Sequence, residues 1–196
     1  MDVTLRLSRA GLFSRSLAVV AALGGSAVGA AELAASSASD QSAARDSAIL
    51  NLGLLVARLQ AAFYAEALRE GRLEGEVHQY ADVVGSQEKQ HVTFLVGALG
   101  SHAAKSPKFQ FGDATSDSKK FVATAATLES TSLGVYNGQA VNLTPQTLAA
   151  AAKIVSVEAR HAAWARALAG KDPAPVAVDT PISIGQAKSA LAPFLA

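Results

Sequence analysis

Two glutamate–histidine pairs with identical spacing are the most informative feature of this 196-residue sequence. Glu88 is followed three residues later by His91, and Glu158 is followed three residues later by His161. Residues three apart lie on the same face of a helix, so each pair would present an oxygen and a nitrogen donor together. A motif this short has a false-positive rate, and the composition gives roughly 0.16 such pairs by chance. Finding two indicates a shared role.

A third glutamate, Glu129, stands in the middle of another apolar helical pattern, between the two pairs in sequence. A carboxylate buried there without a partner costs several kcal/mol or stays protonated, so all three acids require an explanation. The chain has no cysteine, which excludes disulfides, thiolate metal sites and cysteine nucleophiles. Any metal ion would therefore be held by oxygen and nitrogen atoms, which Glu and His supply.

Four long helices are predicted to position these side chains. Apolar residues recur at helical spacing over residues 46–70, 73–99, 118–141 and 145–169. Each stretch is roughly 25 residues, or about 37 Å long, so the four can pack side by side. Only 6% of the residues are aromatic and alanine is abundant, which favours close-packed helices. The prediction is an all-α four-helix bundle with a long connection between its second and third helices.

The two ends of the chain differ in composition from the predicted bundle. Arginines followed by an apolar run and small residues make residues 1–30 resemble an export signal, with a transit peptide or an uncleaved anchor as alternatives. Residues 31–46 are predicted to be a flexible lead-in because they are rich in serine and alanine. Residues 171–196 contain four prolines and are predicted to be a tail that packs on the bundle.

Charge and hydropathy limit the partners of the chain. The formal net charge of +1 gives no extended positive field for a phosphate backbone, so no nucleic-acid partner is expected. The apolar run near the N-terminus is short and interrupted by glycine, so no permanent membrane helix is expected either. The sequence leaves the oligomeric state open, a homo-oligomer included.

The order of the three acids and two histidines resembles that of the ferritin-like carboxylate bundles. More narrowly, the chain is similar to the ferritin-like family that includes plant desiccation-related proteins and exported bacterial proteins. The segments that carry this resemblance are Leu59–Tyr64, Gln87–Val92, Phe109 and Phe111 after Pro107, Leu128-Glu129, Tyr136–Gly138, Glu158–Ala163, and the tail with Pro181 and Pro193–Leu195.

The resemblance implies a function outside the cytosol, in the periplasm, the extracellular space or an organelle lumen, often linked to stress. It implies a divalent metal partner, iron or manganese, bound by Glu88, His91, Glu129, Glu158 and His161. As an enzyme, the chain would be a metal-dependent oxidoreductase that acts on oxygen or peroxide. As a non-catalytic protein, it would be a stress-related bundle whose buried Glu/His network holds no metal. The sequence does not decide between these two readings.

The chain departs from the family pattern in the first helix. Relatives carry a glutamate ligand there, whereas the matching positions are Ala57 and Gln60, neither of which supplies a negative charge. Glu66 lies about 9 Å further along the helix and is too distant to substitute. We therefore expect the metal position near His91 to be weakened, and one metal site, or none, rather than two.

Other residues with reactive side chains receive less prominent roles from the sequence. His78 and His102 lack inward-facing acids and are predicted to lie on the surface. Tyr64 and Tyr136 are expected mainly to pack in the bundle, although a phenol there could also hydrogen-bond to a carboxylate or carry a radical. Trp164 is predicted to lie in the core or an interface.

Overall fold

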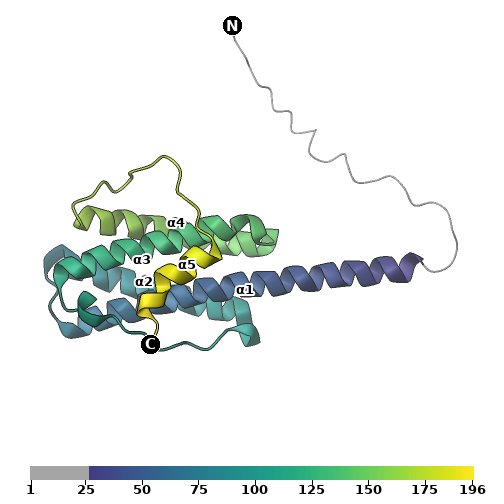
Figure 1. The fold of residues 1–196 in the computed structure, drawn as a ribbon, viewed down its shortest axis with the longest axis horizontal. Coiled ribbons are helices and arrows are strands. Elements are labelled where there is room, and N and C mark those ends of the chain that lie inside the picture. Colours follow the sequence, from purple (N-terminus) through teal and green to yellow (C-terminus); the bar gives the residue numbers. More distant parts are fainter. Residues whose placement is uncertain (1–26) are drawn as a thin grey trace, which may run out of the picture. The chain divides into compact units, whose positions relative to one another are not determined.

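The computed structural model of the chain describes the backbone of residues 27–196 and side chains from residue 39 onward. Four long helices, α1 (Ala27–Glu70), α2 (Gly75–Leu99), α3 (Ser118–Gln139) and α4 (Pro145–Leu168), precede a short helix, α5 (Ile184–Leu191). Within the compact unit formed by residues 38–196, α1 from residue 38 onward lies side by side with α2, α3 and α4 (Figure 1). The described residues contain no β-strand, which confirms the predicted all-α bundle.

The helix ends agree with the sequence prediction except at the start of α1. The other ends of the long helices differ from the predicted ones by at most two residues. The predicted lead-in, residues 31–46, is instead part of α1. This segment is rich in alanine, the best helix former, and contains no glycine or proline to stop a helix. Most of the predicted signal peptide, residues 1–26, lies outside the described residues.

Local sequence signals explain where the helices begin and end. Thr144 is the N-cap residue of α4, and Pro145 occupies its first turn, where its missing N–H costs nothing. Asp117 caps α3 by accepting a hydrogen bond from the backbone N–H of Lys120 at 2.8 Å. Gly71 follows α1 with φ of +65°, a left-handed conformation that glycine adopts without strain.

The C-terminal tail packs along α3 and reaches the α2–α3 connection. The Ile182 backbone N–H donates to the Gly134 carbonyl at 3.0 Å. A Cβ atom on Gly138 would lie 2.1 Å from the Ile182 carbonyl oxygen, so the tail can approach α3 this closely only because that residue is glycine. The Gln110 N–H donates to the Phe194 carbonyl at 3.0 Å, which joins the tail to the connection.

The main core is aromatic and lies beside the functional cluster described below. Phe63 stacks on Phe121 with ring centroids 5.0 Å apart, and Tyr64 and Tyr80 pack edge-on against them.

Among the described residues, the segment Ser39–Glu70 is long and apolar enough to cross a membrane by length and composition. Within its most apolar window, 56% is buried in the structure, as in a core helix of a bundle.

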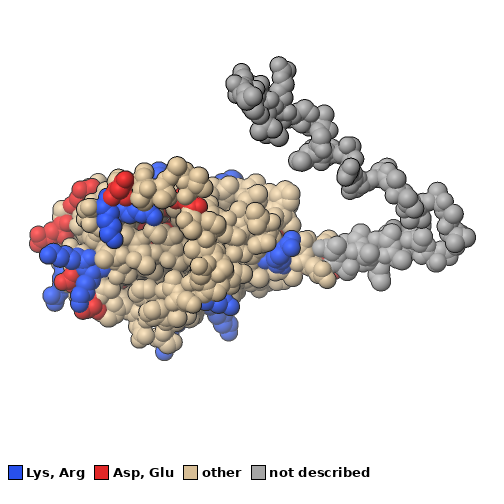
Figure 2. All heavy atoms as spheres, turned by 45° about the horizontal axis from the view of Figure 1, so that its top comes forward, with Lys and Arg blue, Asp and Glu red and all other residues tan. Residues whose placement is uncertain are grey.

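Charged side chains on the viewed face gather at the end of the bundle that holds the α1–α2 turn. Figure 2 shows basic and acidic groups mixed there, with most of the remaining face uncharged. The exposed residues of this turn include Arg69, Glu70, Arg72, Glu74 and Glu76. Because the two signs alternate, their fields largely cancel at this end of the bundle.

Candidate metal centre

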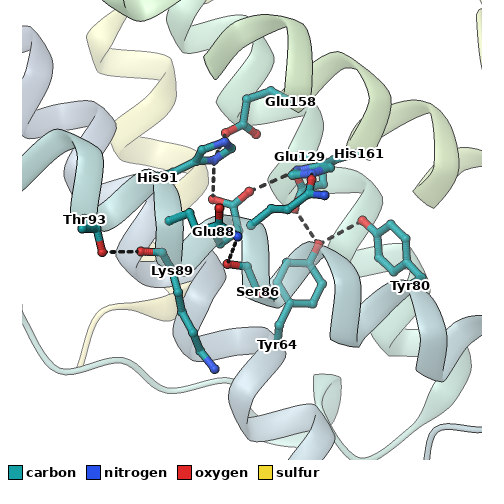
Figure 3. A network of polar contacts seen from close by, with 12 residues as sticks. Tyr64, Tyr80, Ser86, Glu88, Lys89, His91, Thr93, Glu129, Glu158 and His161 are labelled. Atoms are coloured by element: carbon teal, nitrogen blue, oxygen red, sulfur yellow. Dashed lines mark hydrogen bonds and ion pairs between the residues drawn. The ribbon is translucent and has the colours of Figure 1, made fainter. Parts of the chain in front are cut away.

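The five predicted site residues converge inside the bundle from three helices (Figure 3). Helix α2 contributes Glu88 and His91, α3 contributes Glu129, and α4 contributes Glu158 and His161. Glu88 and Glu129 are fully buried, and the other three are at most 8% exposed. The prediction that these side chains share one interior point therefore agrees with the structure, while their role as metal ligands stays a prediction.

Each imidazole of the cluster lies between two carboxylates. His91 Nδ1 is 3.3 Å from Glu88 Oε2 and 3.2 Å from Glu158 Oε1. His161 Nδ1 is 3.1 Å from Glu88 Oε1 and 3.3 Å from Glu129 Oε2. Glu88 thus contacts both histidines and stands at the centre of the arrangement. One ring nitrogen cannot direct a single N–H at two oxygens, so these contacts are electrostatic as much as hydrogen-bonded.

Four members of the cluster carry a buried polar atom that forms no hydrogen bond, although three of these atoms lie in the ion-pair contacts of His161. Glu88, Glu129, Glu158 and His161 can each direct one ligand atom so that all four atoms lie within 4.8 Å of one another. Each of the same residues also has one buried polar atom without a hydrogen-bond partner: Glu88 Oε1, Glu129 Oε2, Glu158 Oε2 and His161 Nδ1. Buried polar atoms without a hydrogen-bond partner destabilise the fold, and a bound cation would remove this destabilisation. The residues present therefore fit a divalent ion, and His91 stands outside this set of four.

Burial and mutual repulsion give the three carboxyl groups different pKa values. Burial, together with the charge of Glu88, raises the pKa of Glu158 to about 8. Burial also raises the pKa of Glu129, and the charge of Glu88 adds to this effect. For Glu88, burial opposes ionisation, but the contacts with both imidazoles outweigh it and lower the pKa. Glu88 is therefore the carboxylate that stays ionised most readily.

The histidines respond to the same acids in the opposite sense. Burial lowers the pKa of His91, yet its contacts with Glu158 and Glu88 prevail and raise it to about 9. Burial likewise opposes protonation of His161, but Glu129 and Glu88 raise its pKa to about 10. In the absence of a metal ion, protons on the two imidazoles therefore balance much of the negative charge of the cluster.

Gln87 orients His161, a role that the sequence analysis missed. His161 Nε2 is 2.6 Å from Gln87 Oε1. An Nε2–H that donates to this amide oxygen leaves the Nδ1 lone pair facing the carboxylates, as a metal ligand requires. Gln87 directly precedes Glu88 in the motif, and its chemistry gave no signal because glutamine is common on helix surfaces.

Among the α1 residues whose side chains the structure describes, none contributes an acid to the cluster, as the sequence predicted. Ala57 and Gln60 are buried, and neither side-chain polar atom of Gln60 has a hydrogen-bond partner. Tyr64, one turn further on the same face, donates its hydroxyl to Glu129 Oε1 at 2.5 Å. Glu66 instead accepts a hydrogen bond from the Thr115 hydroxyl at 2.8 Å. Glu66 therefore does not replace the missing ligand.

The remaining candidates divide between surface and interior. His78 and His102 are exposed, as predicted. Tyr136 has a buried hydroxyl without a hydrogen-bond partner, and burial, followed by the charges of Glu158 and Glu88, raises its pKa well above the ordinary value. Tyr80, which the sequence analysis left out, contacts the Tyr64 hydroxyl at 3.0 Å. A pattern of apolar spacing cannot show that two phenols on different helices meet.

Comparison with known protein families matches residues 45–171 to the ferritin-like domain family. The match runs from residue 45, within α1, to three residues beyond the end of α4, and it includes all five cluster residues. No curated protein matches the chain. The match accounts for the helical architecture and is compatible with metal binding by the buried cluster.

Proposed function

Because the chain belongs to the ferritin-like domain family, we propose that it binds one divalent iron or manganese ion in its Glu/His cluster and uses it on oxygen or peroxide. The ligands in this proposal are Glu88, Glu129, Glu158 and His161. His91 completes the cluster as a charged neighbour of Glu88 and Glu158.

One observation carries the proposal. The four residues whose ligand atoms approach within 4.8 Å are the same four that each keep a buried polar atom without a hydrogen-bond partner. A cluster evolved only for stability would give each of these oxygens its own donor, because unpaired buried polar groups destabilise a fold. Here the single Nδ1 of His161 faces both Glu88 Oε1 and Glu129 Oε2. Carboxylate oxygens and an imidazole nitrogen directed at a common region are what a divalent cation requires.

Charge supports one ion rather than two. A single divalent ion together with one protonated imidazole neutralises three carboxylates, and His91 is placed between Glu88 and Glu158 to supply that positive charge. Two divalent ions would exceed the three available negative charges. A fourth carboxylate on the first helix would restore the balance, but Ala57 and Gln60 provide none.

The chain's own residues hold and shield the reacting centre. Glu129 is fixed by the Tyr64 hydroxyl, and His161 is oriented by Gln87. Glu88 can bridge towards both histidines because each of its oxygens contacts one of them. Burial excludes bulk water, which strengthens every charge interaction at the site. When bound, a redox-active divalent ion would supply the electron exchange with oxygen or peroxide that no side chain here provides.

A second candidate function is a stress-related bundle in which protons occupy the cluster permanently. The raised pKa values of His91, about 9, and His161, about 10, favour it, because two imidazolium groups already offset two carboxylates. In this reading the Glu/His network is structural. The two candidates differ in whether the cluster takes up a metal ion.

We place the proposed activity outside the cytosol. The arginines followed by an apolar run and small residues in 1–30 support export to the periplasm, the extracellular space or an organelle lumen. Mass analysis of the mature N-terminus tests this: cleavage near Ala31 is expected for a signal peptide, whereas an intact N-terminus in the membrane fraction would indicate an anchor.

Metal analysis of protein purified without an affinity tag tests the metal site. We expect about one equivalent of iron or manganese per chain in the unaltered protein, and less than about a tenth of this in Glu158→Gln, because a neutral amide is a much weaker ligand than a carboxylate. Glu66→Gln is the matched control, since this partly buried glutamate bonds to Thr115 away from the cluster, and it should keep its metal. A stable, metal-free protein that takes up neither ion would favour the structural network.

A further inference from the structure

We propose that the cavity between the C-terminal tail and the bundle binds an organic monocarboxylate with an apolar body, such as a medium-chain fatty acid. The cavity has a volume of about 640 Å³ and is bordered by α3, the end of α4 and tail residues 175–190. Its tail wall lies beyond residue 171, where the match to the ferritin-like domain family ends. The inference is independent of the proposed function, because no residue of the Glu/His cluster lines the cavity.

The path of the tail creates the cavity. Gly170 follows α4 with φ of +67°, and the connection from α4 to α5 stands off the helices as an arch (Figure 1). The arch returns to the bundle at the hydrogen bond between the Ile182 N–H and the Gly134 carbonyl. Residues 171–181 are all exposed, so the arch borders the cavity without filling it. The volume left beneath it is within the range of small-molecule sites.

Two basic side chains line the cavity, and neither has an acidic partner. Arg166 is half-buried, and its Nη2 donates to the Ser130 hydroxyl of α3 at 3.0 Å. Among the described residues, no carboxylate forms an ion pair with Arg166 or Lys171. A guanidinium has five N–H donors, and the contact with Ser130 uses one of them. The other donors suit the two oxygens of a carboxylate.

The Ser130 contact holds the guanidinium in place before any ligand binds. The Ser130 hydroxyl donates to the Ala126 carbonyl at 2.6 Å, so its lone pairs are free to accept from Arg166. The long arginine side chain therefore spans from α4 to α3 at the wall of the cavity. A ligand that pairs with a side chain already fixed in this way loses less conformational entropy on binding.

The charge of the lining favours a monoanion. Arg166 and Lys171 contribute two positive charges, and Asp179 contributes one negative charge, which leaves a charge of +1. One carboxylate restores neutrality. A phosphate ester carries up to two negative charges near neutral pH and would leave an excess of negative charge beside Asp179.

The rest of the lining offers an apolar surface to the body of the ligand. Ala126 and Leu133 of α3 face Val176 and Ile182 of the tail, and Ala190 of α5 lies at the same cavity. Val176 is 56% exposed, which is unfavourable for an apolar side chain in water. An alkyl chain in the cavity would remove part of this surface from water and stabilise the complex. A small inorganic anion could not use this surface.

Isothermal titration calorimetry of the metal-free full-length protein with sodium decanoate tests the site. We expect one decanoate per chain. Acetate has the charge without the apolar body, and decyltrimethylammonium has the apolar body with the opposite charge, so each should bind at least tenfold more weakly. Decyltrimethylammonium that binds as tightly as decanoate would overturn the proposal. Decyl phosphate at about pH 8, where it is a dianion, should also bind more weakly, and tighter binding would overturn the assignment to monocarboxylates.

Matched variants test the two positive charges. Arg166→Met should weaken decanoate binding about tenfold, the equivalent of one charged hydrogen bond. Arg160→Met is the control, because Arg160 is an exposed arginine of the same helix that bonds to the Ser156 carbonyl outside the cavity. Lys171 is exposed, so Lys171→Met leaves the fold intact, and it should weaken binding about threefold. Unchanged affinity in both cavity variants, or in Lys171→Met alone if Arg166→Met does not fold, would overturn the proposal.

Hydrogen–deuterium exchange followed by mass spectrometry tests where the ligand lies. Saturating decanoate should slow amide exchange at least fivefold in residues 172–183, and it should leave the α1–α2 turn, residues 71–74, unchanged. Decanoate that binds without protecting the tail would lie elsewhere on the protein and would contradict the proposal. Neither measurement requires a metal ion, so a protein without metal would overturn the proposed function and leave this inference to be decided by its own result.

Discussion

Asp46 and the Glu/His cluster are two buried acidic regions of one bundle, and they are satisfied in different ways. The Asp46 carboxylate is 7% exposed and accepts hydrogen bonds from the Thr144 N–H and from the Thr144 and Thr147 hydroxyls. Glu88, Glu129 and Glu158 each keep an oxygen without any hydrogen-bond partner. One region has a hydrogen-bond donor for each carboxylate oxygen, whereas the other keeps carboxylate oxygens that no donor satisfies.

Position in the fold explains the difference. Asp46, on α1, faces the first turn of α4, where unpaired N–H groups and the helix dipole favour a negative charge. Burial opposes ionisation of Asp46, but the bonds from Thr144 and Thr147 outweigh it and lower its pKa. The three glutamates lie in the middle of helices, where the backbone N–H groups are already used. Mid-helix acids must therefore find protons or a cation.

The comparison predicts that a divalent ion stabilises the protein through the cluster alone. With Mn²⁺ at a hundred times its dissociation constant, the free energy of unfolding should rise by about 2.7 kcal/mol. The rise should vanish in Glu158→Gln and persist in full in Asp46→Ala. Urea unfolding followed by circular dichroism, with and without Mn²⁺, measures both. A rise that survives in Glu158→Gln would show that the ion binds elsewhere.

Removal of the Asp46 carboxylate should destabilise the metal-free fold. Asp46→Ala leaves the N-terminus of α4 and two threonine hydroxyls without their acceptor, at a cost of about 2 kcal/mol in the free energy of unfolding. Glu158→Gln in the metal-free protein should cost much less, because it removes a buried acid that is held against repulsion from Glu88. If both variants lose equal stability, the distinction between the two acidic regions is wrong.

The sequence predicts the bundle well because its signals are local. Apolar periodicity, Pro145 after Thr144, and the glycines after α1 and α4 fix the helices to within two residues, apart from the start of α1. The convergence of Glu88, Glu129 and Glu158 was also predictable, since each stands on the apolar face of a helix and acids there need a common partner.

The features that the sequence could not predict are contacts between residues far apart in the chain. The carboxylate of Asp46 caps a helix that begins about a hundred positions later, and no local pattern links it to Thr144. Gln87 reaches His161 only because α2 and α4 lie side by side at that level. The Tyr80 contact with Trp164 likewise depends on how two helices are rotated about their axes. The spacing of apolar residues identifies the buried face of a helix, but it does not identify the residues on other helices that this face contacts.

The two acidic regions should lose stability at opposite ends of the pH scale. Because the folded-state pKa values of His91, about 9, and His161, about 10, exceed the unfolded value near 6.5, their contribution is complete below pH 6.5 and disappears as the pH rises through 9 to 10. Glu158, with a pKa of about 8, acts in the same direction between pH 4.5 and 8. Asp46, whose pKa is lowered, loses its contribution only as the solution becomes acidic.

Urea unfolding of the metal-free protein at pH 6.5 and pH 9.5 measures this difference. The free energy of unfolding should fall by at least about 1 kcal/mol over this interval, since one pKa unit corresponds to roughly that amount. The fall should be smaller in His91→Gln and unchanged in Asp46→Ala. A flat profile in the unaltered protein would mean that the imidazoles do not hold the extra protons.

The smallest expected change in stability tests the missing first-helix ligand. Gln60→Glu adds a carboxylate where both amide atoms are now without partners, and in the metal-free protein it should cost less than about 1 kcal/mol, because the new acid can stay protonated. With a fourth negative charge available, metal analysis should show two ions per chain instead of one. Gln60→Met, of similar volume but apolar, is the matched control and should keep one ion. Loss of that ion in Gln60→Met would show that the amide oxygen of Gln60 is itself a ligand. One ion in both Gln60→Glu and Gln60→Met would show that the position of residues 57 and 60 along α1, and not charge alone, prevents the second site.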